Sequence, residues 1–225
     1  MNEWQAIWTV AMKDLRTEWR SKAATVATVF FSAVTLLILA FALGRDESAM
    51  RLAAPGVLWV ALAFAGLISS AQSYQHDLEE GAFDQLLTLP IPRVAVFHGK
   101  LLAHVVTMSL LGILLVPVTA VLFDAPVQTG HLSLLATVVL GTLGFSVISM
   151  FYAALTANLR ARESLLPVLM FPVVVPILLA SVRATEAIVT TGDAALAGDW
   201  LQLLLGFDLI YLVVTSAVYH VVVEE

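Results

Sequence analysis

Apolar residues fill six long stretches of this chain, and charged residues gather in the short segments between them. A helix rises about 1.5 Å per residue, so roughly 20 residues cross the hydrocarbon layer of a bilayer. The pattern therefore predicts an all-α polytopic membrane protein, in which residues 1–225 form a single transmembrane domain. The six predicted transmembrane helices are residues 23–43, 52–75, 101–123, 132–157, 165–182 and 201–223.

The first 22 residues have a different pattern. Trp4, Trp8, Leu15 and Trp19 recur at helical spacing, and the charged residues fall largely between them. This pattern predicts an amphipathic helix over residues 1–22 that lies in the membrane interface, with its tryptophans at headgroup depth. A helix that packs on a soluble partner remains the alternative.

Composition agrees with a membrane protein, since 60% of the residues are hydrophobic, 12% are charged and the mean hydropathy is +0.93. The net charge of −6 indicates no particular partner, and nothing points to nucleic acid. With no cysteine, the chain has no disulfide and no thiolate metal site. Ala40 and Ala42 resemble a signal-peptide cleavage site, but Glu3, Asp14 and Glu18 in the leading segment favour a retained first helix.

Lysine and arginine predict the orientation. Eight of the eleven fall on the side of the N-terminus, and three fall on the other side. Basic residues accumulate on the cytoplasmic side of membrane proteins, so both termini are expected in the cytoplasm. The first group is Lys13, Arg16, Arg20, Lys22, Arg93, Lys100, Arg160 and Arg162, and the second is Arg45, Arg51 and Arg183.

The segment between the second and third spans is amphipathic. From Asp77 to Leu89, leucines and Phe83 alternate with acidic residues, and Pro90 and Pro92 then end the pattern. Acidic residues at the start and prolines at the end are typical of a short helix, predicted here over residues 77–89. Such a helix can lie on the membrane or insert into a groove on a partner, and the residues alone favour neither.

Motifs of soluble enzymes are absent from the sequence. Gly99-Lys100 is the only Gly-Lys pair, and Val94 stands where a P-loop has its first glycine. There is no H-E-x-x-H and no G-x-S-x-G, so no catalytic residue is assigned. His76 and Glu80 could meet on one helix face, but two ligands in a charged loop favour a solvated surface over a metal site.

The last two spans hold residues that are costly in a membrane. Pro167, Pro172 and Pro176 should kink or break the fifth span. The kink or break could act as a hinge, line a substrate path, or be a static feature of helix packing. Asp208 should pair, bind a proton or face water, and a hydrogen bond to a hydroxyl on a neighbouring helix is slightly favoured over a transport role. His104 and His220 lie near helix ends, where they could reach the surface or ligate a haem iron.

Three runs in this order resemble the CcmB family, the permease subunits of the cytochrome c maturation ABC complex. They are Ala54 to Val60 (APGVLWV), Glu80 to Leu87 (EGAFDQLL) followed by Gly99-Lys100, and Arg160 to Pro167 (RARESLLP). The resemblance implies an ABC-2 (type V) exporter-like permease in the bacterial inner membrane, in which residues 77–89 are the coupling helix. The residues expected to contact the ATPase are Asp77, Glu79, Glu80, Gly81, Phe83, Asp84, Leu86 and Leu87.

The same resemblance implies partners. A separate CcmA-like ATPase subunit would bind and hydrolyse ATP, so this chain would be non-catalytic. CcmC-like and CcmD-like membrane proteins, a periplasmic CcmE-like haem chaperone and a second copy of the chain are the other expected partners. Haem would be the handled substrate, exported, delivered to the chaperone or released from it, and no cofactor would be held firmly here.

Two other functions remain open. One is an ABC-2 permease for a lipid-linked glycan or a drug, and the other is a membrane scaffold that transports nothing. An ion-coupled secondary transporter is disfavoured, because Asp208 stands alone and the sequence has no sign of an inverted repeat.

Overall fold

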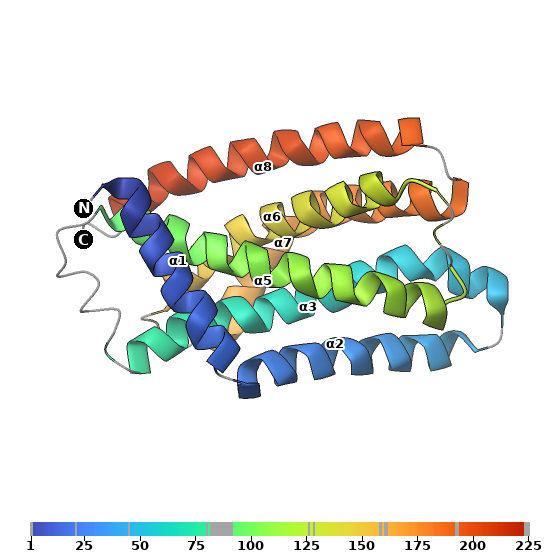
Figure 1. Ribbon diagram of the computed structural model, residues 1–225, viewed down its shortest axis with the longest axis horizontal. Coiled ribbons are helices and arrows are strands. Elements are labelled where there is room, and N and C mark those ends of the chain that lie inside the picture. The colour runs from blue at the N-terminus through green and yellow to red at the C-terminus, as the bar shows by residue number, and fades with distance from the viewer. Residues whose placement is uncertain are drawn as a thin grey trace.

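Helices make up every regular element in the described part of the computed structural model (Figure 1). The structure describes residues 2–20, 22–44, 46–79, 81, 92–125, 127, 129–157, 159, 162–191 and 194–222. The elements are α1 (Glu3–Arg20), α2 (Lys22–Leu43), α3 (Glu47–Glu79), α5 (Arg93–Leu122), α6 (His131–Thr156), α7 (Arg162–Glu186), the π-helical turn η1 (Ala187–Thr191) and α8 (Ala194–Val222).

The prediction of six transmembrane helices is confirmed, since α2, α3, α5, α6, α8 and α7 with η1 are each long and apolar enough to span a bilayer. They run side by side, while α1 crosses one end of the bundle at a steep angle (Figure 1). We call this end, which also holds the C-terminal end of α8, the α1 end. Helix α3 has 33 residues and α5 has 30, so both extend beyond their apolar runs into charged sequence.

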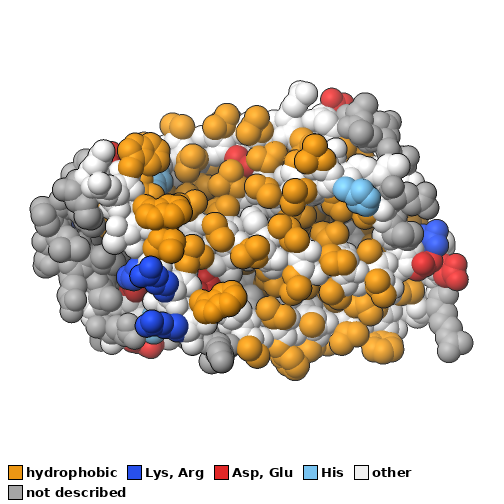
Figure 2. Space-filling model, viewed as in Figure 1, with side chains coloured by type: hydrophobic (Ala, Val, Ile, Leu, Met, Phe, Trp, Pro, Cys, Tyr) orange, Lys and Arg blue, Asp and Glu red, His pale blue; other side chains and the backbone are white. Residues whose placement is uncertain are grey.

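The outer surface of the bundle is apolar over most of its length, and most of the charged side chains in view lie toward its ends (Figure 2). Exposed residues such as Phe41, Leu110 and Val213 belong to this apolar surface, which suits contact with lipid tails. On α1, Val10 and Ala11 are buried, whereas Trp19 is 86% exposed. Helix α1 thus has a buried side and an exposed side, and its place in the membrane interface stays a prediction.

Helix α6 is the centre of the bundle and packs against α3, α5, α7 and α8. Its glycines permit these close approaches. A Cβ at Gly141 would lie 2.3 Å from the indole of Trp59, and one at Gly144 would lie 2.6 Å from Cδ1 of Ile177. Small residues at helix contacts are typical of membrane proteins, because apolar side chains gain little by leaving apolar lipid.

The predicted start of the coupling helix needs correction. No new helix begins at Asp77, because α3 continues through Glu79. Gly81 then has a φ of +65° and donates its amide to the carbonyl of Leu78, 3.2 Å away, so α3 ends before Gly81. A glycine in this left-handed conformation is a common way to end a helix. Phe83, Asp84, Leu86 and Leu87 lie outside the described residues, as does Glu80.

The three prolines of the fifth span do not interrupt it. Helix α7 includes Pro167, Pro172 and Pro176, and the departure from α-helical geometry comes later, in η1. Between the second and third proline, the hydroxyl of Tyr211 on α8 donates to the carbonyl of Val173, 3.3 Å away. Neighbouring helices can thus satisfy carbonyls near a proline. The span is therefore not broken at the prolines, whereas a kink and a role as hinge stay predictions.

Candidate functional site

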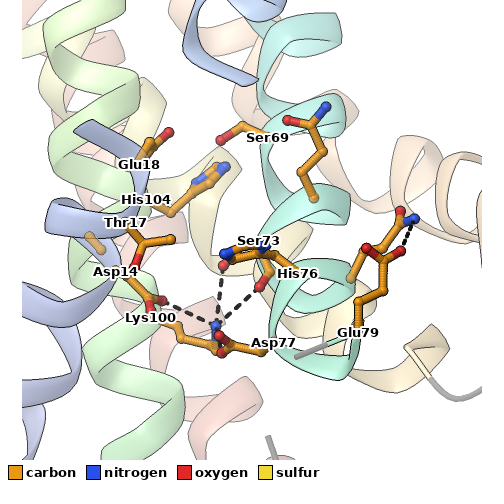
Figure 3. Close-up of a pocket in the computed structure, with 13 residues that line it drawn as sticks. Asp14, Thr17, Glu18, Ser69, Ser73, His76, Asp77, Glu79, Lys100 and His104 are labelled. Carbon is orange, nitrogen blue, oxygen red and sulfur yellow. Dashed lines mark hydrogen bonds and ion pairs between the residues drawn. The ribbon is translucent and has the colours of Figure 1, made fainter. Parts of the chain in front are cut away.

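Four charged side chains meet at the α1 end, where they join α1, α3 and α5, and Figure 3 shows three of them, Asp14, Asp77 and Lys100. We call Lys13, Asp14, Asp77 and Lys100 the four-charge cluster. Nζ of Lys100 lies 2.5 Å from Oδ2 of Asp77 and 3.1 Å from Oδ2 of Asp14. Nζ of Lys13 lies 2.8 Å from Oδ1 of Asp77 and 3.0 Å from Oδ1 of Asp14. Two cations and two anions therefore compensate one another.

Lys100 is the most deeply buried member, with only 1% of its surface exposed. Its ammonium also donates to the carbonyl and the hydroxyl of Ser73, each 3.3 Å away, and it lies 5.0 Å from the centre of the Tyr74 ring. A buried lysine without such partners would be costly, so these contacts explain how it stays inside the bundle. The sequence had placed Lys100 in a loop before the third span, and the structure places it in α5.

Gly99 explains how α1 comes near enough to reach Lys100. A Cβ at Gly99 would lie 2.6 Å from Cβ of Val10 and 2.8 Å from the carbonyl oxygen of Ile7. Real Cβ atoms do not approach other atoms this closely, so a larger residue at this position would push α1 away from α5. Gly99 thus allows α1 to pack closely on α5, and Lys100 forms an ion pair with α1.

Lys13 is affected by both carboxylates of the cluster. Partial burial alone would lower its pKa, but the nearby charges of Asp14 and Asp77 outweigh this effect and raise it above 10.5. Lys13 therefore stays charged at any physiological pH.

A cavity of about 320 Å³ opens beside the cluster, between α1, α3 and α5 (Figure 3). Most of the residues that line it are of polar type, and they include Glu18, His76, Glu79 and His104, together with Asp14, Asp77 and Lys100. The carboxylate of Glu18 accepts a hydrogen bond of 2.7 Å from the hydroxyl of Thr107. Burial raises the pKa of Glu18 above 4.5, and the hydrogen bond from Thr107 lowers it in part.

His104 does not reach the surface as the sequence suggested, because it is only 4% exposed. Its Nδ1 lies 2.9 Å from the hydroxyl of Ser146, and its Nε2 lies 3.3 Å from the carbonyl of Gly66. Both ring nitrogens are thus occupied by contacts with α3 and α6. The side chain of His220 lies outside the described part of the chain.

The predicted site residues divide into three groups. Asp77 enters the four-charge cluster, and Glu79 lines the cavity and accepts a hydrogen bond from Gln75. Asp208 lies elsewhere, in the middle of α8, and the prolines lie on α7. Among the residues that the structure describes, no group of three or more histidines and carboxylates could hold a metal ion.

Comparison with known proteins assigns the chain to a family, because the sequence model of the CcmB protein matches residues 5–223. The chain belongs to the CcmB family. It is 35% identical to heme exporter protein B of Rhodobacter capsulatus over 167 residues, which cover 74% of this chain and 76% of the relative. It is 31% identical to heme exporter protein B of Paracoccus denitrificans over 175 residues, which cover 78% and 80%.

A more distant CcmB relative agrees with this assignment. Heme exporter protein B of Escherichia coli K12 is 26% identical over 181 residues, which cover 80% of this chain and 81% of the relative. These matches and the six apolar helices identify the chain as a multi-pass membrane protein. The resemblance drawn from the three sequence runs is confirmed.

Proposed function

We propose that this chain is the permease subunit of an ABC transporter that exports haem for the maturation of c-type cytochromes. The names of its relatives, heme exporter protein B, support this function. The chain would lie in the bacterial inner membrane with both termini in the cytoplasm. A separate CcmA-like subunit would hydrolyse ATP, and CcmC-like, CcmD-like and CcmE-like proteins would receive or deliver the haem.

The observation that carries the mechanism is the position of the four-charge cluster. Asp77 and Glu79 lie in the last turn of α3, where the segment that is expected to contact the ATPase, residues 77–89, begins. The cluster ties this turn to α1 through Lys13 and to α5 through Lys100. A displacement of the coupling segment by the ATPase would therefore move three helices together.

The cavity beside the cluster does not suit haem. Haem carries two carboxylates, and the cavity lining holds Asp14, Glu18, Asp77 and Glu79. Lys100 is the only lysine or arginine among the described lining residues, and it is already paired with Asp14 and Asp77. Repulsion between like charges would oppose the entry of haem. The haem route of this proposal therefore lies elsewhere, along another surface of the bundle or between subunits.

Co-purification with the ATPase tests the proposal. A variant with Phe83→Ala and Leu86→Ala should bind the ATPase less tightly, by about 1–3 kcal/mol for each anchor that is buried in the interface. Leu110→Ala, on the exposed apolar surface of α5, is the matched control and should leave this affinity unchanged. Full co-purification and full ATPase stimulation by the double variant would overturn the proposed coupling contact.

A further inference from the structure

Asp208 lies at the middle of the membrane. The last span runs from Leu196 to Tyr219, so Asp208 is twelve residues from its start and eleven from its end. At 1.5 Å per residue, each end is about 17 Å away. Its side chain is buried, with 2% of the residue exposed. The sequence predicts a span over residues 201–223, which would place Asp208 only seven residues from its start.

The surroundings of the carboxyl group are apolar. It faces Gly144 on α6, where an added Cβ would lie 2.2 Å from Oδ1 of Asp208 and 2.6 Å from Cδ1 of Ile177. Ile177 and Leu204 are fully buried in the same apolar cluster of α3, α6, α7 and α8. The glycine makes room for the carboxyl group, and α6 and α7 close around it.

Neither carboxyl oxygen of Asp208 has a hydrogen-bond partner among the described residues. Tyr211, one turn further along α8, donates its hydroxyl to the carbonyl of Val173 instead. The hydrogen bond to a neighbouring hydroxyl that the sequence favoured is therefore not formed in the described structure. Ser181 on α7 also has a buried hydroxyl without a partner, and it lies against Gly141, one turn from Gly144 on α6.

Charged groups on the packed helices do not compensate Asp208. Helix α6 has no aspartate, glutamate, lysine or arginine, and its one histidine, His131, is its first residue. On α7, the described Arg183 and Glu186 form an ion pair with each other, with 2.8 Å between Nη1 and Oε2. Asp199 on α8 itself is exposed and lies nine residues before Asp208. No described cation is therefore available to an ionised Asp208.

An ionised carboxylate without partners is very costly in an apolar medium, whereas the protonated form is far less so. We propose that Asp208 is a proton-binding site at the centre of the membrane, occupied by a proton while α8 packs on α6. Loss of the proton would require water or a cation at the carboxyl group, and the close contact with Gly144 leaves no room for either on the side of α6. Deprotonation is thus coupled to separation of α8 from α6.

A hydrophobic carbodiimide tests this proposal on the full chain in lipid vesicles. A protonated carboxyl group adds across one C=N bond of dicyclohexylcarbodiimide to give an O-acylisourea, which rearranges to a stable N-acylurea without a leaving group. We expect peptide mass spectrometry to find this adduct on Asp208, and the adduct to be lost in Asp208→Asn. Asp77 is the internal control, because its ion pairs keep it charged and it should remain unmodified.

A water-soluble carbodiimide with a soluble amine provides the second arm. It should modify the exposed Glu47 and spare Asp208. The proposal is overturned if the hydrophobic reagent leaves Asp208 unmodified in the folded wild-type chain. It is also overturned if the water-soluble reagent modifies Asp208 as readily as Glu47, because the carboxyl group would then be hydrated. Neither arm depends on haem export or on the ATPase.

Discussion

Lys100 on α5 and Asp14 on α1 are 86 residues apart in the sequence, yet their charged atoms lie 3.1 Å from each other inside the bundle. Asp77 on α3 completes the contact from a third helix. Helix α1 is therefore held to the membrane bundle by buried charges as well as by apolar packing. This arrangement leads to the first two predictions.

Lys100→Met should strongly destabilise the chain. The substitution removes one of the two cations of the four-charge cluster and leaves Asp14 and Asp77 to share Lys13. Loss of one partner of a buried ion pair typically costs about 3–5 kcal/mol. Thermal unfolding followed by tryptophan fluorescence measures the effect. Arg51→Met breaks the exposed pair with Asp124 at the opposite end and should unfold close to wild type, so equal effects of the two substitutions would contradict the prediction.

Gly99→Ala should loosen α1 from α5. The added methyl group would overlap Val10 and the carbonyl of Ile7, and overpacking of this kind typically costs about 1–3 kcal/mol. Limited proteolysis of α1 in detergent should become faster. Gly206→Ala is the matched control, because nothing lies within 4 Å of the added atom, and its α1 should be cleaved at the wild-type rate. Unchanged cleavage of the Gly99 variant would contradict the prediction.

Glu18→Gln should make stability less dependent on pH. Burial, partly offset by the Thr107 hydrogen bond, raises the pKa of Glu18 above 4.5 in the folded chain, so the folded state holds the proton more tightly than the unfolded state. The stabilisation that protonated Glu18 gives to the folded state is therefore complete below pH 4.5 and is lost as the pH rises through the folded-state pKa. The glutamine cannot ionise and can still accept the hydrogen bond.

Thermal unfolding across pH measures this difference. The Glu18→Gln variant should unfold at a higher temperature than wild type at neutral pH, and the two should converge in acid. Glu47→Gln, in the exposed first turn of α3, is the control and should follow wild type. A variant that is less stable than wild type at neutral pH would show that Glu18 is needed in its charged form.

Replacement of Pro172 and Pro176 with alanine tests the hinge. The substitutions restore two backbone donors to α7, which is already helical across both positions, so assembly with the ATPase should be retained. If the prolines allow α7 to change shape during transport, maturation of c-type cytochromes should fall. Maturation at the wild-type rate would show that the prolines only serve the packing of α7. The hydrogen bond from Tyr211 on α8 to the carbonyl of Val173 is a contact of this packing.

Cysteine labelling tests the topology, because the native chain has no cysteine. A membrane-impermeant maleimide added to intact cells should label Asp46→Cys, which lies between α2 and α3 at the end of the bundle opposite α1. It should not label Asn2→Cys, which precedes α1. Labelling of the second position in sealed cells would reverse the proposed orientation.

The six spans could be predicted because an apolar run of sufficient length has few alternatives to a transmembrane helix. The four-charge cluster could not, because hydropathy ends a predicted span at its first charge. Lys100 and Asp77 were therefore assigned to the loop, although their helices continue. Pairing between such residues depends on contacts across the fold, such as the approach of α1 at Gly99, and sequence spacing does not reveal them. The surroundings of Asp208 were unpredictable for the same reason.

Helix α3 carries an ion pair near each of its ends, with Arg51 bound to Asp124 and Asp77 bound to Lys100. Arg51 and Asp77 are 26 residues apart in one helix, so they are separated by about 39 Å along its axis. This length is close to the ~40–45 Å thickness of a bilayer with its headgroups. The helix therefore fixes the bilayer thickness that suits the protein. In thinner membranes, the bundle must tilt or the bilayer must thicken locally around it. Short-chain lipids should therefore lower the stability of the wild-type chain itself, without any substitution in its ion pairs.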